Sequence, residues 1–316
     1  MEFEVTNEVL LIEPMMPLIE EQLDAAYKVL RLYKPEDKAA IDAAQGVIRA
    51  VVTGGGTGLS NEWIERLPSL GLIAINGVGT DKVDLAFARD RNVYVSTTPG
   101  VLTDDVADIG IALMLAVMRH VATGDQFVRE GKWARREGFP LGVSPKGKRI
   151  GILGLGQIGK TFARRAEAFG MEVHYWNRSP VTDTNWIAHM TPVELAQHSD
   201  VLAVCVAANP STANIVNTDV LAALGSKGYL INVARGSVID EDALLAALNN
   251  EVIAGAGLDV FVNEPTIRED FLTAPNMVLM PHQGSATVET RVGMGELVLA
   301  NLAAYFSGDV PPTTVN

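Results

Sequence analysis

The second half of the chain places reactive side chains directly after three apolar stretches. The stretches "INVARGSVID", "GLDVFVNEP" and "MVLMPHQGSA" deliver Arg235, then Asp259 and Glu264, then His282. In open parallel sheets the carboxyl ends of the strands line the ligand crevice. A guanidinium there can bind a carboxylate through two hydrogen bonds, and an imidazole can exchange a proton near neutral pH. Each residue also has a plainer interpretation: Arg235 as a surface residue, Glu264 as a solvated loop acid, His282 as a structural histidine.

A glycine pattern upstream predicts a cofactor site. "GILGLGQIGK" sets Gly154, Gly156 and Gly159 in G-x-G-x-x-G spacing, between a predicted strand and the predicted helix "QIGKTFARRAEAFG". The first glycine allows a tight turn, the second lets the backbone approach a pyrophosphate, and the third lets the helix pack closely on the strand. The helix N-terminus adds amide donors for the pyrophosphate. A glycine-rich turn without a ligand is the alternative.

The end of the next predicted strand, "MEVHYWNRSP", indicates which dinucleotide binds. Asn177 stands where an NAD site places an acid on the ribose, and Arg178 and Ser179 follow it. An amide can bond a ribose without repelling a 2′-phosphate, while the arginine fork and the hydroxyl can bond that phosphate. This end of the strand therefore predicts NADP(H), with tolerance of NADH left open. Arg164 and Arg165 either assist or are solvated.

The elements that position these residues alternate along the chain. β-branched runs such as "VLLIEP", "VIRAVVTG", "KRIGILG" and "GYLINVAR" are separated by amphipathic segments, which predicts two doubly wound α/β units with parallel sheets. Residues 103–128 read as one long helix that begins at Thr103. The Gly-, Pro- and Arg-containing segment that follows reads as a projecting arm.

Composition limits the partners. The 316 residues carry a formal charge of -13, which argues against nucleic acid or an anionic membrane as partner. The N-terminal stretch lacks a signal-peptide pattern and the longest apolar run is half a membrane span, so we expect a cytoplasmic protein. Cys205 lies in an apolar run and is expected to be a packing residue. We expect the four histidines other than His282 to be structural, without reactive neighbours; they are His120, His174, His189 and His198.

Taken together, these motifs resemble one enzyme family. Through "GLGQIG", "NVARGSVIDEDAL", "AGAGLDVFVNEP" and "PHQGSAT", nearly the whole chain resembles the D-isomer-specific 2-hydroxyacid dehydrogenases. Within that family it is most similar to NADPH-preferring glyoxylate/hydroxypyruvate reductases and plant-type hydroxyphenylpyruvate reductases. The resemblance implies that Arg235 binds the substrate carboxylate and polarises the keto oxygen, that His282 is the general acid and that Glu264 is its partner. It implies no metal.

The resemblance also extends the set of binding residues. Asp259 is expected either to bond the nicotinamide carboxamide and tune His282, or only to cap a turn. The further cofactor contacts implied are Gln157, Ile158, Val206, Pro210, Thr212, Val233 and Gly284, besides Arg235 and His282 themselves. The substrate carboxylate is expected on the amides of Val78 and Gly79, which otherwise form a plain turn. Met15 and Met16 are candidates for the pocket wall, and Trp133 and Phe139 of the arm reach either the neighbouring subunit's pocket or only a dimer interface.

The domain organisation implied is discontinuous. Residues 1–97 and 287–316 form a flavodoxin-like substrate domain, and residues 98–286 form a Rossmann NADP-binding domain with a dimerisation arm at about 120–147. The predicted function is NADPH-dependent reduction of a short 2-ketoacid, glyoxylate or hydroxypyruvate, to the D-2-hydroxyacid by a homodimer. Two alternatives are a reductase of bulkier 2-ketoacids such as hydroxyphenylpyruvate and a non-catalytic, nucleotide-sensing protein of the corepressor type.

Overall fold

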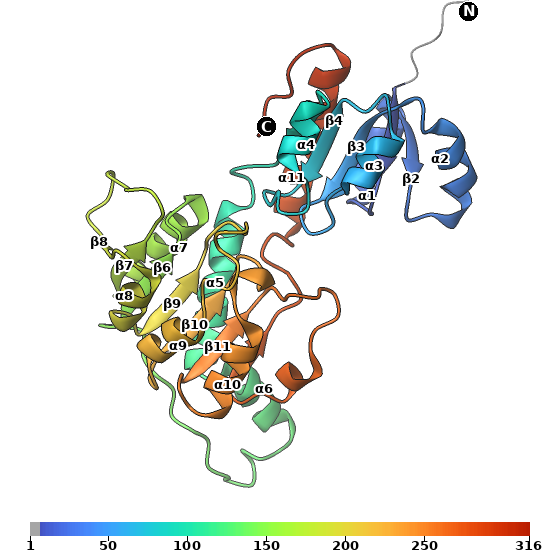
Figure 1. Ribbon diagram of the computed structural model, residues 1–316. Coiled ribbons are helices and arrows are strands. Elements are labelled where there is room, and N and C mark those ends of the chain that lie inside the picture. Colours follow the sequence, from blue (N-terminus) through green and yellow to red (C-terminus); the bar gives the residue numbers. More distant parts are fainter. Residues whose placement is uncertain (1–6) are drawn as a thin grey trace, which may run out of the picture. The chain divides into compact units, whose positions relative to one another are not determined.

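The computed structural model describes residues 7–316, which form two compact units. One unit consists of the chain up to Leu102 together with Thr287–Asn316, and the other is Thr103–Ala286. In Figure 1 the blue N-terminal and red C-terminal segments build the first unit, and the green, yellow and orange segments build the second. Each unit is a parallel sheet covered by helices, so the predicted fold class is confirmed.

The first boundary differs from the one predicted after residue 97. The backbone N–H of Thr97 donates to the carbonyl of Thr313 at 3.2 Å, and that of Thr98 donates to the carbonyl of Gly77 at 2.8 Å. Both threonines are buried. These hydrogen bonds keep Thr97 and Thr98 within the first unit, which extends to Leu102.

The first unit has a five-stranded sheet in the order β2-β1-β3-β4-β5, which is the order of flavodoxin-like folds. Its strands are β1 (Glu8–Leu11), β2 (Lys28–Arg31), β3 (Ile48–Gly54), β4 (Leu72–Asn76) and β5 (Tyr94–Ser96). Its helices are α1 (Pro17–Ala26), η1 (Pro35–Asp37), α2 (Lys38–Ala44), α3 (Asn61–Arg66), α4 (Leu85–Asp90) and the C-terminal α11 (Val288–Phe306).

Both faces of this sheet are buried, which explains why its strands are almost continuously apolar. Leu10 and Ile73 belong to one buried cluster, whereas their neighbours Leu11 and Leu72 belong to a second one. Side chains alternate between the two faces of a strand, so helices on both faces bury every position. The second cluster includes Leu302 of α11, which returns the C-terminus to this unit.

The second unit has a seven-stranded parallel sheet in the order β12-β11-β10-β9-β6-β7-β8. Its strands are β6 (Arg149–Leu153), β7 (Glu172–Trp176), β8 (Ile187–Ala188), β9 (Val201–Val204), β10 (Tyr229–Asn232), β11 (Gly255–Leu258) and β12 (Met277–Leu279). Its helices are α5 (Thr103–Met118), α6 (Val121–Arg129), α7 (Gln157–Ala168), α8 (Pro192–Gln197), α9 (Thr218–Leu224), η2 (Gly236–Val238), α10 (Glu241–Asn249) and η3 (Glu269–Leu272). The strand order reverses between β6 and β9, as in Rossmann folds, and ligands bind at such a switch point.

The long helix predicted over residues 103–128 is wrong, because the chain breaks between α5 and α6. His120 has a φ of 56°, in the left-handed region, and the two helix axes are bent by 60°. The carbonyl of Met118 accepts the N–H of Val143 at 2.8 Å, which turns the end of α5 toward the arm. Helix α5 packs against β10, β11 and α7, whereas α6 is a separate helix on the surface.

Within residues 7–316, no single helix is long and apolar enough to cross a membrane. The bent pair α5 and α6 reaches the required length and composition only when the two are taken together. Half of α5 is buried inside the protein.

Candidate active site

The glycine turn has the geometry that a bound dinucleotide requires. Gly154 has a φ of 101°, and a Cβ on it would lie 2.7 Å from the backbone nitrogen of Val206. A Cβ on Gly159 would lie 2.1 Å from the carbonyl oxygen of Gly154, so α7 packs directly on the turn. A Cβ on Gly156 would meet nothing within 4 Å, and no side chain of the described residues caps α7. The first N–H groups of α7, from Gln157 onward, therefore open toward a space that suits a pyrophosphate.

Asn177 has a contact that the sequence did not predict. Its Oδ1 accepts the N–H of Leu155 in the glycine turn at 3.1 Å, and its Nδ2 donates to the carbonyl of Ser179 at 2.8 Å. The amide thus joins the glycine turn to the segment that follows β7, and its contact with a ribose stays a prediction. Arg178 and Ser179 are exposed.

Of the two arginines on α7, Arg165 is already paired with carboxylates and Arg164 is exposed. Arg165 pairs with Asp108 at 2.5 Å and with Asp104 at 2.9 Å, both on α5. It therefore joins α7 to α5 and is not available to a cofactor. Arg164 is exposed on the same helix.

The other implied cofactor contacts lie after strands β6, β9, β10 and β12 of this unit. Thr212 donates its hydroxyl to the carbonyl of Ala207 at 2.8 Å and so folds the loop after β9. Val206 and Val233 are buried beside the strand ends. Their positions at the switch-point edge are consistent with the expected nucleotide contacts, which remain predictions for all of Ile158, Val206, Pro210, Thr212, Val233 and Gly284.

His282 and Glu264 form the acid–base pair of the unit. His282 Nδ1 lies 2.6 Å from Glu264 Oε2, and Glu264 Oε1 accepts the N–H of Phe261 at 2.8 Å. Burial of Glu264 raises its pKa, but the hydrogen bonds from His282 and Phe261 and the nearby charge of Arg235 outweigh burial, so the pKa is lowered. Glu264 is therefore an anion at neutral pH and accepts the hydrogen bond from His282 Nδ1.

Asp259 fixes the backbone of this pair. Its Oδ1 accepts the N–H of Gln283 at 2.7 Å and its Oδ2 accepts the N–H of Gly284 at 2.8 Å. Its carbonyl accepts the N–H of His282, which has a φ of 54°. Burial raises the pKa of Asp259 although the two backbone donors lower it. Asp259 thus caps the turn that holds His282 in a costly left-handed conformation, and its contact with a carboxamide stays a prediction.

Arg235 follows β10 and lies near the pair. Its backbone carbonyl accepts the side-chain amide of Asn232 at 2.9 Å, and its Nη1 donates to the carbonyl of Ala234 at 2.8 Å. Asn232 is buried, so the first residues after β10 are held by a side chain of the strand itself. Arg235, Glu264 and His282 thus follow β10, β11 and β12, and the charge of Arg235 acts on Glu264.

The candidate substrate residues of the first unit follow its strands β1 and β4. Val78 is exposed and Gly79 half-buried in the loop after β4. Met15 and Met16 are partly buried against the cluster beneath α11, and the N–H of Met15 donates to Glu20 at 2.9 Å. Their substrate contacts stay predictions.

The two aromatic residues of the arm differ in exposure. Phe139 packs on Phe127 of α6 with ring centroids 5.0 Å apart, whereas the side chain of Trp133 is 72% exposed. The ring of Trp133 is thus the more exposed of the two, and the contact of either residue with a neighbouring subunit stays a prediction.

Sequence reasoning missed a cluster of histidines. His174, His189 and His198 were expected to lack reactive neighbours, yet their rings stack on one another at the edge of the second sheet. No spacing rule joins residues from β7, the end of β8 and the end of α8. Cys205 directly follows β9, and burial of its thiol raises the pKa to about 12; its packing role stays a prediction.

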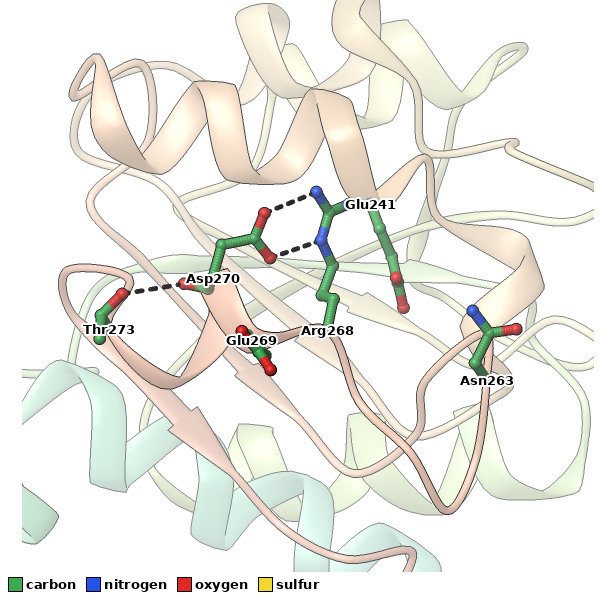
Figure 2. Close-up of a pocket in the computed structure, with 6 residues that line it drawn as sticks. All are labelled: Glu241, Asn263, Arg268, Glu269, Asp270 and Thr273. Atoms are coloured by element: carbon green, nitrogen blue, oxygen red, sulfur yellow. Dashed lines mark hydrogen bonds and ion pairs between the residues drawn. The ribbon is translucent and has the colours of Figure 1, made fainter.

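This unit also has a hollow whose lining includes neither Glu264 nor His282. It has a volume of about 710 Å³ and is lined by Glu241, Asn263, Arg268, Glu269, Asp270 and Thr273. Figure 2 shows the guanidinium of Arg268 forked onto Asp270, and Arg268 also pairs with Asp242 at 2.7 Å. The carboxylates thus neutralise its one arginine, which leaves no cation for an anionic ligand. Within residues 7–316, no group of three or more His, Cys, Asp or Glu side chains is arranged to hold a metal ion.

A Rossmann sheet with an open glycine turn and an acid–base pair after its strands defines an oxidoreductase that uses a nicotinamide dinucleotide. Residues 111–284 match the family model described as "D-isomer specific 2-hydroxyacid dehydrogenase, NAD binding domain". The chain is an enzyme of the D-isomer specific 2-hydroxyacid dehydrogenase family, which confirms the resemblance.

Its relatives are reductases of several 2-ketoacids. A 2-ketogluconate reductase of Gluconobacter oxydans is 47% identical over 95% of this chain and 96% of its own length. A hydroxyphenylpyruvate reductase of Plectranthus scutellarioides is 44% identical over 95% and 96%. The crystal structure of an NADPH-dependent glyoxylate/hydroxypyruvate reductase from Sinorhizobium meliloti, in complex with NADP and malonate, is 42% identical, covers 98% of this chain and 96% of its own, and has a TM-score of 0.92.

Two glycine substitutions separate packing from ligand space. We expect Gly159→Ala to lower the free energy of unfolding by about 2 kcal/mol or more, because its Cβ meets the backbone oxygen of Gly154. Gly156→Ala should change stability by about 1 kcal/mol or less and weaken dinucleotide binding, because its Cβ enters open space. Denaturant unfolding and cofactor titration measure both, and equal stability of the two variants would contradict the packing argument.

Glu264→Gln tests the acid–base pair. We expect kcat for ketoacid reduction to fall about tenfold or more, because a neutral amide no longer gives the imidazole a charged hydrogen-bond partner that orients it. Since the pKa of Glu264 is lowered in the folded chain, the pair stabilises the fold fully at neutral pH and loses that contribution only as pH falls through the lowered value. The matched control is Glu241→Gln, whose carboxylate accepts the N–H of Val262. An unchanged kcat for Glu264→Gln would show that proton donation by His282 does not depend on Glu264.

Proposed function

We propose that this enzyme reduces a short 2-ketoacid, glyoxylate or hydroxypyruvate, to the D-2-hydroxyacid and takes its reducing equivalents from NADPH. The observation that carries the cofactor assignment is the end of β7, where Asn177, Arg178 and Ser179 stand in place of a carboxylate. An acid there would repel a 2′-phosphate, whereas an exposed arginine and hydroxyl attract it. The relative from Sinorhizobium meliloti is NADPH-dependent, which supports the same preference.

The proposed chemistry assigns one role to each residue of the constellation. The nicotinamide, when bound, supplies the hydride. Arg235 binds the substrate carboxylate through two hydrogen bonds and holds the carbonyl in one orientation. His282, charged and oriented by Glu264 through Nδ1, gives its proton from Nε2 to the oxygen that becomes negative. Asp259 keeps the backbone of His282 in place during this transfer.

The relatives named above support a 2-ketoacid but differ in its size. Hydroxyphenylpyruvate and 2-ketogluconate are both larger than glyoxylate, and each shares only the 2-ketoacid group with it. The proposed contacts of Arg235 and His282 involve only that shared 2-ketoacid group. A bulkier 2-ketoacid is therefore the second candidate substrate, and the wall of the pocket decides between them.

Steady-state kinetics test the substrate and the cofactor together. We expect the highest kcat/KM for glyoxylate or hydroxypyruvate with NADPH, against hydroxyphenylpyruvate, 2-ketogluconate and NADH. Arg178→Ala should lower kcat/KM for NADPH about 10- to 100-fold, because a charged hydrogen bond to the phosphate is lost, and leave NADH nearly unchanged. Arg89→Ala, on α4 of the first unit, is the control for net charge. Preference for NADH would refute the phosphate site, and preference for a larger ketoacid would establish the second candidate.

We further propose that two copies of the chain pair through α6 and the arm. Val121 and Val128 of α6 are each more than half exposed, and in the arm Leu141 is 94% and Trp133 72% exposed. Exposed apolar groups of this kind mark a protein interface, and two-fold pairs are the commonest assemblies. Light scattering should give twice the chain mass of 33.8 kDa. Val128→Asp with Leu141→Asp should give monomers, and a monomeric wild type would refute the proposal.

A further inference from the structure

Three imidazole rings stack at the outer edge of the second sheet. The ring centroids of His174 and His189 are 5.2 Å apart, and those of His189 and His198 are 4.7 Å apart. The interplanar angles are 19° and 25°, so the rings lie nearly parallel. The side chains of His174 and His189 are almost completely buried. His198 Nδ1 lies 2.9 Å from the carbonyl of Glu194 and must donate to it.

A row of two carboxylates and two rings runs through this stack. His174 Nδ1 and His189 Nε2 are 2.9 Å apart, within hydrogen-bond distance. The outer ring nitrogens face acids: His174 Nε2 lies 3.7 Å from Glu172 Oε1, and His189 Nδ1 lies 3.5 Å from Glu194 Oε1. Both outer nitrogens are buried and have no hydrogen-bond partner among the described residues. Each of them therefore depends on its carboxylate.

Counting protons shows that two neutral rings cannot satisfy this row. The inner contact uses one N–H, and a neutral imidazole carries only one. If His174 donates inward, its bare Nε2 faces Glu172; if His189 donates inward, its bare Nδ1 faces Glu194. One additional proton removes the conflict, since both outer nitrogens then carry an N–H toward a carboxylate. The pair is complete with one proton more than two neutral rings hold.

The surrounding charges indicate where that proton resides. Burial lowers the pKa of His174, and so do the nearby His189, Arg149 and His198, against the opposite effect of Glu172. The backbone N–H of Met190 and the charges of His189 and His198 lower the pKa of Glu194, which stays an anion. Arg149, one of the groups that lower the pKa of His174, is itself paired with Asp200 at 3.3 Å. The lowered pKa of His174 thus disfavours a positive charge on that ring alone, and the additional proton is shared along the row of two rings and two carboxylates.

The pair closes the segment that carries the proposed phosphate site. Residues 177–186 connect β7 to β8, and β8 has only two residues in register with β7. The near end of this segment is held by Asn177 on the glycine turn, and His189 follows directly after β8 at its far end. Other contacts in the segment are independent of pH near neutrality, such as Lys160 to Asp183 at 2.7 Å and Trp186 to Glu167 at 2.9 Å.

We propose that His174 and His189 share one proton between Glu172 and Glu194, and that this protonated pair positions the segment 177–186 for the phosphate of the cofactor. His174 and His189 are then positioning residues that act through Arg178 and Ser179. When the two histidines lose the additional proton as pH rises, a bare ring nitrogen faces a carboxylate. The end of the segment next to His189 is then held less firmly. Affinity for NADPH then falls more than affinity for NADH. This second step depends on the NADPH site proposed above.

The proton count is measured on the protein alone. Nitrogen NMR of ¹⁵N-histidine-labelled enzyme resolves protonated from bare ring nitrogens, and His174→Gln and His189→Gln identify the signals. We expect three N–H groups on the four nitrogens of the pair at low pH and two at high pH, between about pH 5.5 and 8.5. Two N–H groups throughout that range would overturn the proposal. This readout does not depend on the substrate or on the NADPH assignment.

The link to the cofactor is tested with Glu194→Gln. An amide oxygen can still accept the N–H of Met190, as Glu194 does at 2.9 Å, while the amide NH₂ can donate to a bare His189 Nδ1. The variant satisfies the neutral pair, so its NADPH KM should lack the rise of about three- to tenfold that we expect in the wild type with rising pH. The NADPH phosphate itself titrates near about pH 6, equally in both proteins, so their comparison removes that effect.

Glu62→Gln, on α3 of the first unit, is the control for the lost charge and should keep the wild-type profile. The kcat at saturating cofactor should be the same in all three proteins, since the pair touches no reacting atom. Superposable NADPH KM profiles for the wild type and Glu194→Gln would refute the positioning role. If Arg178→Ala leaves NADPH preference unchanged, the phosphate site fails, while the proton count of the histidine pair still stands.

Discussion

The 2.6 Å contact between Glu264 and His282 is the interaction on which the chemistry of this enzyme depends. It requires the ends of β11 and β12 to lie side by side, and a backbone at His282 that is costly without support. Asp259 provides that support by accepting two consecutive N–H groups, at the cost of burying a carboxylate. The packing of the apolar strands thus offsets the free-energy cost of holding one imidazole in one orientation.

The cofactor end of the sheet is also held in one conformation by specific contacts, which involve other residues. Gly154 and Gly159 leave no room for side chains, so β6 and α7 meet at a distance set by backbone contact. Asn177 ties this turn to the segment after β7, and the histidine pair lies at the other end of that segment. In a chain with a formal charge of -13, anionic ligands meet local positive charge only where such segments present it.

Patterns that depend on near neighbours in sequence predicted the structure well. The alternation of strands and helices, the glycine turn and the residues after β10, β11 and β12 follow from local spacing and from the rule that parallel strands end at one edge. The break at His120 was not predictable, because residues 103–128 remain apolar with helical period on both sides of it. A hydrogen bond from Val143, distant in sequence, ends α5 at Met118. The first unit extends beyond residue 97 for the same kind of reason, because the N–H of Thr97 donates to the carbonyl of Thr313, which is distant in sequence.

The sequence by itself determined the family, the two parallel-sheet units and the types of residue at the strand ends, since each rests on short-range pattern and composition. Tertiary structure alone decided which groups face one another. It committed Arg165 to Asp104 and Asp108, gave Asp259 to the turn of His282, and stacked His174 on His189 between two carboxylates. Such contacts join elements far apart in the chain, and their geometry comes from packing of whole elements, which no local spacing encodes.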